Sequence, residues 1–414
     1  MPASRVASAL RGKTVLFVGA GRHQRRAIAR VQELGVRVVA VDGNADAPGL
    51  ASADAGEVVD FTDVESVAAV GAAHSVDGVL TVAADRAVPV VAAVAERLGL
   101  PGIGSETAHL ATNKIAMRRA FAERGVPQPQ FAGVRLFPEV KAAARAVGFP
   151  AVLKPADSAG QRGIFLVRSA DELAAQLVLT LAASPTGEAI VERYHEGREV
   201  NTLLVARDGE ARLLTASDRI RPEGAGFGVA LAHLYPSTLF GDALAEVERV
   251  AIAAVRAIGL RDGIAYPQLL VSPHDNEVLV VEIAARIPAG QMDEVPRYGV
   301  GIDLVEVALR EALGEEVPDE LVTPRFQQPV AIRFLTAEPG PLPTGVVQAV
   351  GPLDKALAFP GVERVDAWIR AGETIRPVQT DGDRRGYVIA VGDTNLEALE
   401  RAEAASRLID VLTG

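Results

Sequence analysis

The sequence predicts a multidomain protein of the α/β and α+β classes. Over the first hundred residues, short apolar runs alternate with segments of helical periodicity, which is typical of a parallel sheet with crossover helices. Further on, two apolar runs flank the short segment SPHDN (272–276), which indicates an antiparallel hairpin. A chain of 414 residues is long enough for two to four domains, at roughly 100–200 residues each.

Composition narrows the class of protein. The net charge of −11, without a basic stretch, argues against nucleic acid or an anionic membrane surface as a partner. The chain has no cysteine, which excludes disulfides, a thiol nucleophile and cysteine-bound metal. Its apolar runs are shorter than the ~20 residues of a membrane span, and no secretory signal is recognisable at the N-terminus. We therefore expect a cytoplasmic protein.

The first α/β unit opens on a glycine turn, Gly19-Ala20-Gly21, between an apolar run and a helical segment. With Asp42 at the end of the next strand, the pattern is close to a dinucleotide-binding fingerprint, but Gln24 stands where the third glycine is required. The turn is therefore either a structural strand–helix junction or a pocket wall with Gly21 near substrate. The expected strands are 14–18, 37–41, 57–60 and 78–82, and the expected helices are 22–35, 63–74 and 86–98.

The middle of the chain shows a second alternation of strands and helices, after a turn-rich exit at 100–114. Prolines at 318, 324 and 329 indicate a boundary, beyond which a small α+β region ends on a predicted helix, 395–412. The expected strands are 148–155, 188–194, 200–209, 264–271 and 277–284, and the expected helices are 114–124, 170–183, 242–259 and 303–313.

Two features near residue 155 are candidates for binding an anion. Lys154 lies on an apolar strand, where its charge requires an anionic partner unless the side chain reaches water. The loop 157–163 that follows contains Gly160 and Gly163, and its backbone amides could cover phosphates. An ordinary surface hairpin is the alternative, because the loop does not match the Walker pattern.

Two clusters of charged residues are further candidates. Glu192 and Glu199 flank a turn and could accept hydrogen bonds from a sugar or an amine, although a solvated charge cluster has the same pattern. On the strand 277–284, the period of two places Glu282 on one face, with Arg286 beyond it, and the hairpin brings Gln268 near Glu282. This arrangement suits a hard cation beside an anion. A buried Glu–Arg ion pair is the alternative.

Taken in order, these residues and Asn113-Lys114 resemble the ATP-grasp superfamily, and the tail resembles carboxylate–amine ligases of the L-amino-acid-ligase type. The resemblance implies a Rossmann-like N-terminal domain (1–108), a two-part ATP-grasp module (109–320) with a lid at about 148–200, and a C-terminal ligase-type domain (321–414). It also implies an ADP-forming enzyme that activates a carboxylate as an acyl phosphate and couples it to an amine. A homodimer is expected by the same analogy.

The resemblance also implies a role for each candidate residue. Lys114 and Lys154 match the lysines that contact nucleotide phosphates, and the loop with Ser158, Gly160 and Gly163 matches the segment that closes over them. By the same resemblance, the segment of Glu192 contacts adenine and Glu199 binds the ribose hydroxyls. Glu282 matches a ligand of Mg²⁺ or Mn²⁺, and Arg286 matches the arginine that stabilises the acyl phosphate and the tetrahedral intermediate.

The sequence departs from the family pattern at several positions. Gln268 stands where an acidic metal ligand is usual, which leaves one-metal and two-metal sites open, and Ala284 replaces an asparagine. His233 and Arg385 resemble substrate contacts, but Ala230 replaces a glutamate that often accompanies the histidine. Two other functions stay open: an ATP- and bicarbonate-dependent carboxylase of the purine-biosynthesis or biotin type, and a nicotinamide-dependent oxidoreductase or nucleotide-binding regulator.

Overall fold

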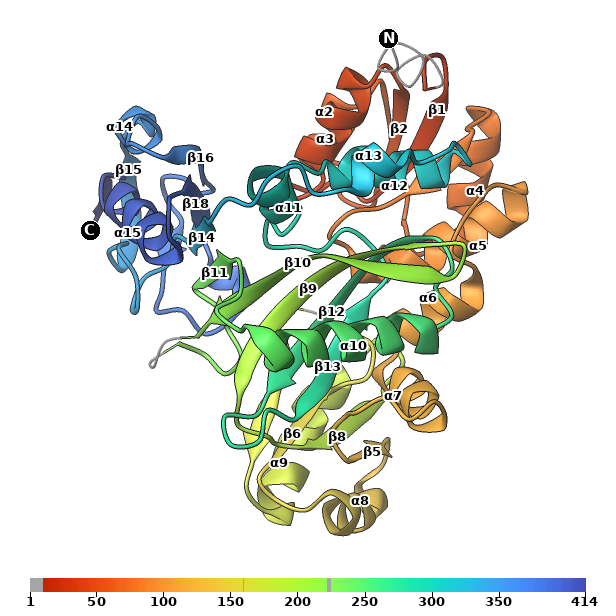
Figure 1. Ribbon diagram of the computed structural model, residues 1–414, viewed down its shortest axis with the longest axis vertical. Helices are drawn as coiled ribbons and strands as arrows, with labels where there is room; N and C mark the ends of the chain where they lie inside the picture. The colour runs from red at the N-terminus through yellow and green to blue at the C-terminus, as the bar shows by residue number, and fades with distance from the viewer. Residues whose placement is uncertain (1–9, 159, 222–224) are drawn as a thin grey trace.

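The structure is a computed structural model that describes residues 10–158, 160–221 and 225–414. Its N-terminal part is a four-stranded parallel sheet in the order β3-β2-β1-β4, flanked by helices (Figure 1). The strands are β1 (Thr14–Val18), β2 (Arg37–Asp42), β3 (Ala55–Val58) and β4 (Gly78–Leu80), and the helices include α2 (Arg25–Glu33), α3 (Pro48–Ser52), α4 (Val64–Ala73), α5 (Val88–Leu98) and α6 (Ser105–Thr112).

The strand order creates a crevice at the carboxyl ends of β1 and β4. Because β2 lies on one side of β1 and β4 on the other, the connections diverge there, where α/β sheets bind ligands. Gln24 closes the β1–α2 turn by donating to the carbonyl of Val82, after β4, at 2.7 Å. Asp42 accepts from the amide of Ala20 at 2.8 Å. Both fingerprint positions thus stabilise the turn itself.

A second sheet of four strands, β5-β8-β6-β7, has antiparallel pairing throughout and carries two helices. It begins at Phe131, earlier than the start of about 148 expected for the lid, because β5 pairs with β8. The alternation of apolar residues indicates the strands locally but does not say which of them pair. The elements are β5 (Phe131–Val134), α8 (Val140–Val147), β6 (Ala151–Pro155), β7 (Phe165–Val167), α9 (Ala170–Ala182) and β8 (Ala189–Arg193).

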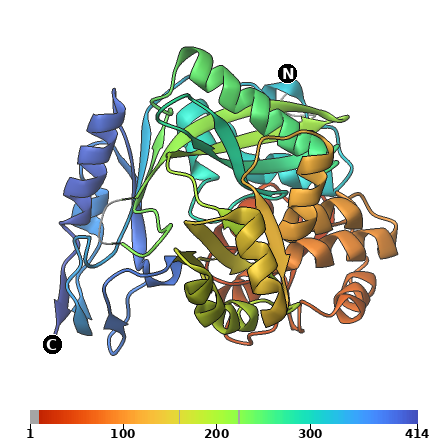
Figure 2. The same ribbon diagram turned by 90° about the horizontal axis from the view of Figure 1, so that it is seen from below.

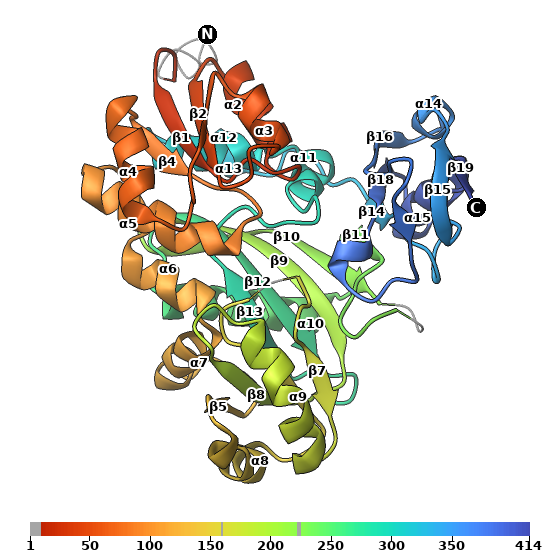
Figure 3. The same ribbon diagram turned by 180° about the vertical axis from the view of Figure 1, so that it is seen from behind.

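The largest sheet has eight strands in the order β13-β12-β9-β10-β11-β14-β18-β16, all antiparallel. It continues across the proline-marked boundary, since β11 pairs with β14 (Figures 1 and 3). The strands are β9 (Arg198–Arg207), β10 (Glu210–Ile220), β11 (Ala232–Tyr235), β12 (Gly263–Val271), β13 (Val278–Ala284), β14 (Val330–Phe334), β16 (Val362–Ala367) and β18 (Gly386–Val391).

Helix α10 (Gly241–Ala257) covers one face of the β9–β10–β12–β13 half of this sheet. Its buried stripe, which includes Val247, Val250 and Ala254, packs against Leu204, Leu269 and other strand residues that point to that face. Residues of the alternate register, such as Gln268, point to the opposite face, where the second sheet lies (Figure 2). Part of this opposite face is also buried, because Leu203, Val205 and Ile264 belong to a second hydrophobic cluster, and another part lines a cavity.

Two helix predictions need correction. The last helix, α15, ends at Ser406 and not at 412, because Val411–Thr413 forms strand β19 paired with β15 (Gly345–Val350). The exit 100–114 contains α6, which buries Ala108 and Ala111, although its surrounding glycine and proline residues suggested a loop. The other C-terminal elements are α14 (Asp354–Leu357) and β17 (Thr374–Ile375). No helix among the described residues is long and apolar enough to cross a membrane.

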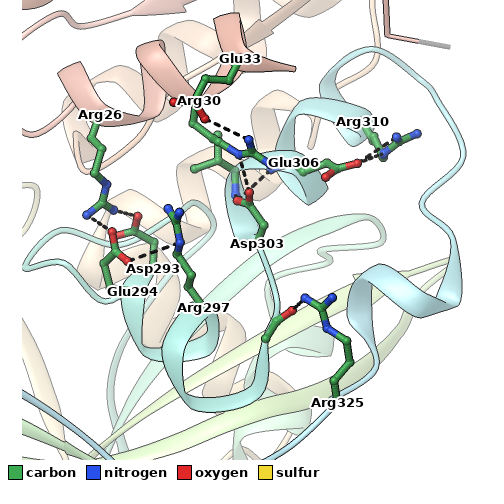
Figure 4. A network of polar contacts seen from close by, with 12 residues as sticks. Arg26, Arg30, Glu33, Asp293, Glu294, Arg297, Asp303, Glu306, Arg310 and Arg325 are labelled. Atoms are coloured by element: carbon green, nitrogen blue, oxygen red, sulfur yellow. Dashed lines mark hydrogen bonds and ion pairs between the residues drawn. The ribbon is translucent and has the colours of Figure 1, made fainter. Parts of the chain in front are cut away.

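A network of ion pairs joins α2 of the N-terminal part to the segment that carries α11 (Glu294–Val300) and α12 (Leu304–Ala312), as Figure 4 shows. Arg26 of α2 pairs with both Asp293 and Glu294, and Glu294 is fully buried. From β16, Arg364 Nε lies 3.7 Å from a Glu294 oxygen. A buried carboxylate is stable only with such counter-charges, so this contact ties the N-terminal and C-terminal parts to the middle of the chain.

A carboxylate of α12, Glu311, has no ion-pair partner within 4.0 Å among the residues that the structure describes. Its Oε1 atom is buried and accepts no hydrogen bond, and burial, together with Asp262, raises the pKa of Glu311 to about 8 against the opposing effect of Arg207. An unfolded glutamate titrates near pH ~4.3, so the unfolded chain loses this proton first and stability falls as pH rises from about 4.3 to 8.

We expect Glu311→Gln to raise the melting temperature more at pH 8 than at pH 5. Equal gains at both pH values would contradict this.

Candidate active site

A cavity of about 970 Å³ lies on the face of the large sheet opposite α10, between that sheet, the four-stranded lid sheet, the crevice of the N-terminal sheet and a C-terminal loop. Most sequence-predicted site residues line it. They are Lys114, Lys154, Ser158, Gly160, Glu192, Glu199, His233, Gln268, Glu282 and Arg286. Three others, Gly21, Gly163 and Arg385, do not line the cavity.

Lys114 begins helix α7 (Lys114–Glu123), where Asn113 caps the first turn by accepting from the amides of Ile115 and Ala116. Its Nζ donates to the carbonyl of Ser158 at 2.9 Å and lies 3.9 Å from Glu282 Oε2. This lysine therefore connects the loop 157–163 to the large sheet across the cavity. A cation in that position suits a phosphate chain that passes between them.

The loop 157–163 differs in part from its predicted role. Ser158 and Gly160 line the cavity, whereas Ala159 lies outside the described residues. Gly163 packs at the base of the loop, where an added Cβ would lie 2.8 Å from the Ala183 side chain and its carbonyl accepts from Thr180. Its positive φ of 69° also favours glycine. Gly163 thus shapes the loop and does not contact the cavity.

Lys154 and Glu192 form a buried ion pair on the neighbouring strands β6 and β8. Glu192 accepts from Lys154 Nζ and from Arg118 Nε, both at 2.8 Å, and Arg118 also donates to the carbonyls of Val280 and Val281. Burial alone would raise the pKa of Glu192, but the two cations lower it to about 2. Burial lowers the pKa of Lys154 in spite of Glu192. The strand lysine thus has an anionic partner and does not simply reach water.

Glu199 forms ion pairs with two arginines, Arg219 near the end of β10 and Arg221 directly after it. Its Oε2 lies 3.1 Å from Arg219 Nε, and its Oε1 lies 2.9 Å from Arg221 Nη1. Both arginines line the cavity. The predicted ribose carboxylate is therefore also the counter-ion of an arginine pair, and this pair adds positive charge beside the large sheet.

The two predicted metal ligands lie side by side on β12 and β13, where Gln268 pairs with Glu282 in register. The side chain of Glu282 is 39% exposed, and its Oε2 lies 3.9 Å from Lys114 Nζ. Gln268 Oε1 accepts a hydrogen bond from Arg219 Nη1 at 3.2 Å. Within the described ranges, no cluster of three or more acidic or histidine side chains is arranged to hold a metal. One carboxylate beside a phosphate site fits a single Mg²⁺ completed by phosphate oxygens and water.

Arg286 follows β13 and crosses to the N-terminal crevice. Its Nε donates to Asp85 Oδ1 at 2.9 Å, and its Nη2 donates to the same oxygen. Asp85 begins the turn after β4, at the diverging end of the parallel sheet. The carboxylate holds the guanidinium of Arg286, which lines the cavity and whose Nη1 also donates to the carbonyl of Ile287 at 3.1 Å.

The end of the cavity nearest the C-terminal part combines arginines with aromatic rings. The guanidinium of Arg384 lies 3.9 Å from the centre of the Phe334 ring, and that of Arg22 lies 4.5 Å from the Trp368 ring. Among the described residues, Arg22 has no carboxylate within 4.0 Å. The predicted substrate contacts Gly21 and Arg385 are replaced by their neighbours: Arg22 and Arg384 line the cavity instead.

The positions of Gly21 and Arg385 have a local cause. Arg384 Nη2 donates to the carbonyl of Ala230 at 2.7 Å, whereas Arg385 Nη1 donates to the carbonyl of Gly382 and Arg385 itself does not line the cavity. Successive residues that enter strand β18 point to opposite faces. Gly21 contributes only backbone to the β1–α2 turn, whose long side chains Arg22 and His23 reach the cavity. The resemblance to the family thus indicated Gly21 and Arg385, each of which is next in sequence to the residue that lines the cavity, Arg22 or Arg384.

His233 is buried, and its Nδ1 lies 2.9 Å from Asn201 Nδ2, which can only donate. With the Asn201 amide in this orientation, a neutral ring carries its proton on Nε2. Burial, followed by Arg219 and Arg384, lowers the pKa of His233 well below its ordinary value. Burial, followed by Arg22 and Arg384, lowers the pKa of His23 to about 4. Both imidazoles are uncharged donors or acceptors near neutral pH.

We therefore expect the rings of His23 and His233 to keep neutral chemical shifts between pH 5.5 and 8. NMR of histidine-labelled protein, assigned with His23→Gln and His233→Gln, measures this directly. The urea-unfolded chain is the reference, because its histidines titrate near pH ~6.5. A midpoint near 6.5 for either ring in the folded protein would contradict the prediction.

Sequence reasoning missed several residues that line the cavity: Asp85, Arg219, Arg221, Trp368 and Arg384. One signal was available for two of them: Arg219 on β10 and Arg221 directly after its end are two residues apart, so an extended chain places both side chains on one face. Asp85 could have been suspected from its place after β4. Trp368 and Arg384 enter from the C-terminal part by contacts that no local pattern indicates.

Comparisons with known proteins match three consecutive segments that together cover most of the chain. The ATP-grasp N-terminal domain family matches residues 29–102, and the L-amino acid ligase C-terminal domain 2 family matches residues 333–414. The family of the carbamoyl-phosphate synthase L chain, ATP binding domain, matches residues 113–320, about half of the chain.

Individual relatives are distant but cover long stretches. A formate-dependent phosphoribosylglycinamide formyltransferase of Ignicoccus hospitalis is 28% identical over 415 residues, covering 96% of each chain. A D-alanine–D-alanine ligase of Gloeobacter violaceus is 30% identical over 227 residues, covering 51% of this chain and 72% of the relative.

Solved structures show the same fold. An L-amino acid ligase from Bacillus licheniformis has a TM-score of 0.83 at 19% identity, covering 98% of this chain and 99% of that one. A phosphoribosylglycinamide synthetase from Anaerococcus prevotii has a TM-score of 0.76 at 19% identity, covering 97% and 100%. The chain belongs to the ATP-grasp superfamily of ATP-binding ligases, in the carboxylate–amine ligase branch that resembles L-amino acid ligases.

Proposed function

We propose that this enzyme activates a carboxylate with ATP and couples it to an amine, forming an amide and releasing ADP and phosphate. The observation that carries the proposal is the convergence of Lys114, Lys154, Glu282 and Arg286 on one cavity. Three cations and one available carboxylate suit a polyphosphate with a bound cation and a carboxylate substrate beside it.

The nucleotide occupies the space between the two sheets in this proposal. Lys114 and Lys154 contact its phosphates, Ser158 and Gly160 cover them, and the segment from Glu192 to Glu199 faces the adenosine. The lysines are held in place before substrate arrives, Lys114 by the carbonyl of Ser158 and Lys154 by Glu192. Groups fixed in advance need no reorganisation during the reaction, which is the main source of electrostatic catalysis.

The reaction has two steps. A carboxylate oxygen of the substrate attacks the γ-phosphorus of ATP, which forms the acyl phosphate and breaks the bond to ADP. The amine then attacks the acyl carbon, the C–O bond to phosphate breaks, and the amine loses a proton. Arg286 faces the carbonyl oxygen on which charge develops in the second step. Mg²⁺ or Mn²⁺, when bound at Glu282, supplies positive charge to the phosphates.

The substrate end of the cavity favours an anionic group. Arg22 has no carboxylate within 4.0 Å among the described residues, whereas Arg384 pairs with Asp381 at 2.8 Å and stacks on the Phe334 ring. An amine or a carboxylate that carries a second anionic group would gain an ion pair at Arg22. A homodimer is part of the proposal by analogy alone.

The alternative is an ATP- and bicarbonate-dependent carboxylase. One observation favours it: solved structures with the same fold include a biotin carboxylase from Campylobacter jejuni and an N5-carboxyaminoimidazole ribonucleotide synthetase from Thermotoga maritima. This alternative requires ATP turnover that depends on bicarbonate.

The test is a screen for ADP release over carboxylates paired with amines, with formate and bicarbonate included, followed by mass spectrometry of each product. The proposal expects turnover that requires both a carboxylate and an amine, with an amide as product. Turnover that follows bicarbonate without any other carboxylate would replace it with the carboxylase. A lack of ATP binding by calorimetry would contradict both.

A further inference from the structure

Gln268 and Glu282 are neighbours in the wall of the cavity, but they differ in charge and in whether their oxygen atoms are free to bind a metal ion. They are opposite each other in the β12–β13 register, so both side chains leave the sheet on the cavity face. Glu282 is an exposed carboxylate. Gln268 is neutral, and hard divalent cations prefer anionic oxygens. Only one of the two positions therefore offers a strong ligand.

The amide oxygen of Gln268 is, in addition, already occupied by a cation. Arg219 Nη1 donates to Gln268 Oε1 at 3.2 Å, and Arg219 Nη2 donates to the carbonyl of Gly228 at 2.6 Å. Its Nε lies 3.1 Å from Glu199 Oε2. Three partners from three chain segments thus fix a guanidinium whose side chain is only 8% exposed.

The charges around Arg219 keep it protonated. Burial opposes its charge, but Glu199 and the other nearby acids outweigh burial and raise the pKa of Arg219. A guanidinium bound to the Gln268 oxygen repels a divalent ion from that oxygen, because like charges at short range in a partly buried site are strongly unfavourable. The position next to Glu282 therefore already contains one fixed positive charge.

We propose that Arg219 is a built-in cation in the place of a second divalent ion, and that this chain binds a single divalent cation per nucleotide, at Glu282. The inference rests on the proposed function only in requiring that a nucleotide occupies the cavity. Gln268 is then a positioning residue for Arg219 and not a metal ligand. The positive charge that Arg219 provides does not depend on the concentration of free metal.

The test counts bound Mn²⁺ by electron paramagnetic resonance while Mn²⁺ is titrated into the protein saturated with the non-hydrolysable analogue AMPPNP. The wild-type chain is expected to bind one Mn²⁺. The variant Gln268→Glu alone is also expected to bind one, because the new carboxylate pairs with Arg219. The double variant Gln268→Glu with Arg219→Met removes that cation and is expected to bind two.

The control is Arg212→Met, on the same strand β10 but exposed and away from the cavity, which should leave the count at one. Circular dichroism and AMPPNP calorimetry establish that each variant is folded and binds nucleotide. Two Mn²⁺ on the wild-type chain, or one on a double variant that binds AMPPNP, would overturn the inference and leave the proposed function intact. Failure of the wild-type chain to bind AMPPNP would overturn both.

Discussion

Replacing Arg286 with alanine is expected to lower the rate of ADP formation by about 100-fold to 1,000-fold, the usual effect of removing one donor to a developing oxyanion. Its side chain joins the end of β13 to Asp85 of the N-terminal crevice and lines the cavity. Glu282→Ala should cause a loss of the same order, because it removes the partly exposed carboxylate that lies 3.9 Å from Lys114 Nζ. Steady-state ADP release with the carboxylate and amine found by screening measures both.

The matched control for these variants is Arg256→Ala on α10, where the arginine pairs with Glu210 on the surface and lies outside the cavity. Surface ion pairs contribute little to stability, about 0–1 kcal/mol, so its activity should equal that of the wild type. Thermal melts check that Arg286→Ala and Glu282→Ala remain folded. Near-normal turnover in either folded variant would refute its assigned role.

Glu192→Ala is expected to destabilise the protein by about 3–5 kcal/mol, the usual cost of removing one partner from a buried ion pair. The substitution leaves Arg118 and Lys154 close together and buried with no carboxylate between them. The predicted contact of this segment with adenine concerns nucleotide affinity, but the geometry indicates that the Glu192 side chain is first of all structural. Urea unfolding monitored by circular dichroism measures the loss.

A nearby control separates the two roles of this segment. Glu196→Ala changes an exposed glutamate in the turn between β8 and β9 and should leave the unfolding midpoint unchanged. Glu192→Gln keeps the shape and one acceptor, so its loss should fall between the two. Unchanged stability of Glu192→Ala together with weaker ATP binding would show that the side chain serves the nucleotide and not the fold.

The parts of the site that sequence could predict are those that short-range periodicity determines. The hairpin at 272–276 implies that Gln268 lies near Glu282, and the strand register shows this pair. The strand period of two also places Glu282 on the same face as Ala284. Asn113 is a recognisable cap for the helix that carries Lys114. Each of these follows from fewer than twenty consecutive residues.

The parts that sequence could not predict depend on contacts between distant segments. Asp85 and Arg286 are 201 residues apart, and no local pattern pairs them. The pairing of β11 with β14, which makes one sheet of two predicted domains, is of the same kind. Where local patterns misled, as at 395–412, the apolar period continued past Ser406 although the chain had turned into a strand. Pairing with β15 outweighs helix propensity there.

The measurement that tests the central claim most directly is oxygen transfer from the carboxylate to phosphate. The active carboxylate is labelled with ¹⁸O in both carboxyl oxygens and incubated with ATP, amine and enzyme, and the released phosphate is examined by mass spectrometry. Activation as an acyl phosphate predicts one ¹⁸O atom in each phosphate and one in the amide product. Phosphate without ¹⁸O, at the same rate of ADP release, would contradict the proposed reaction.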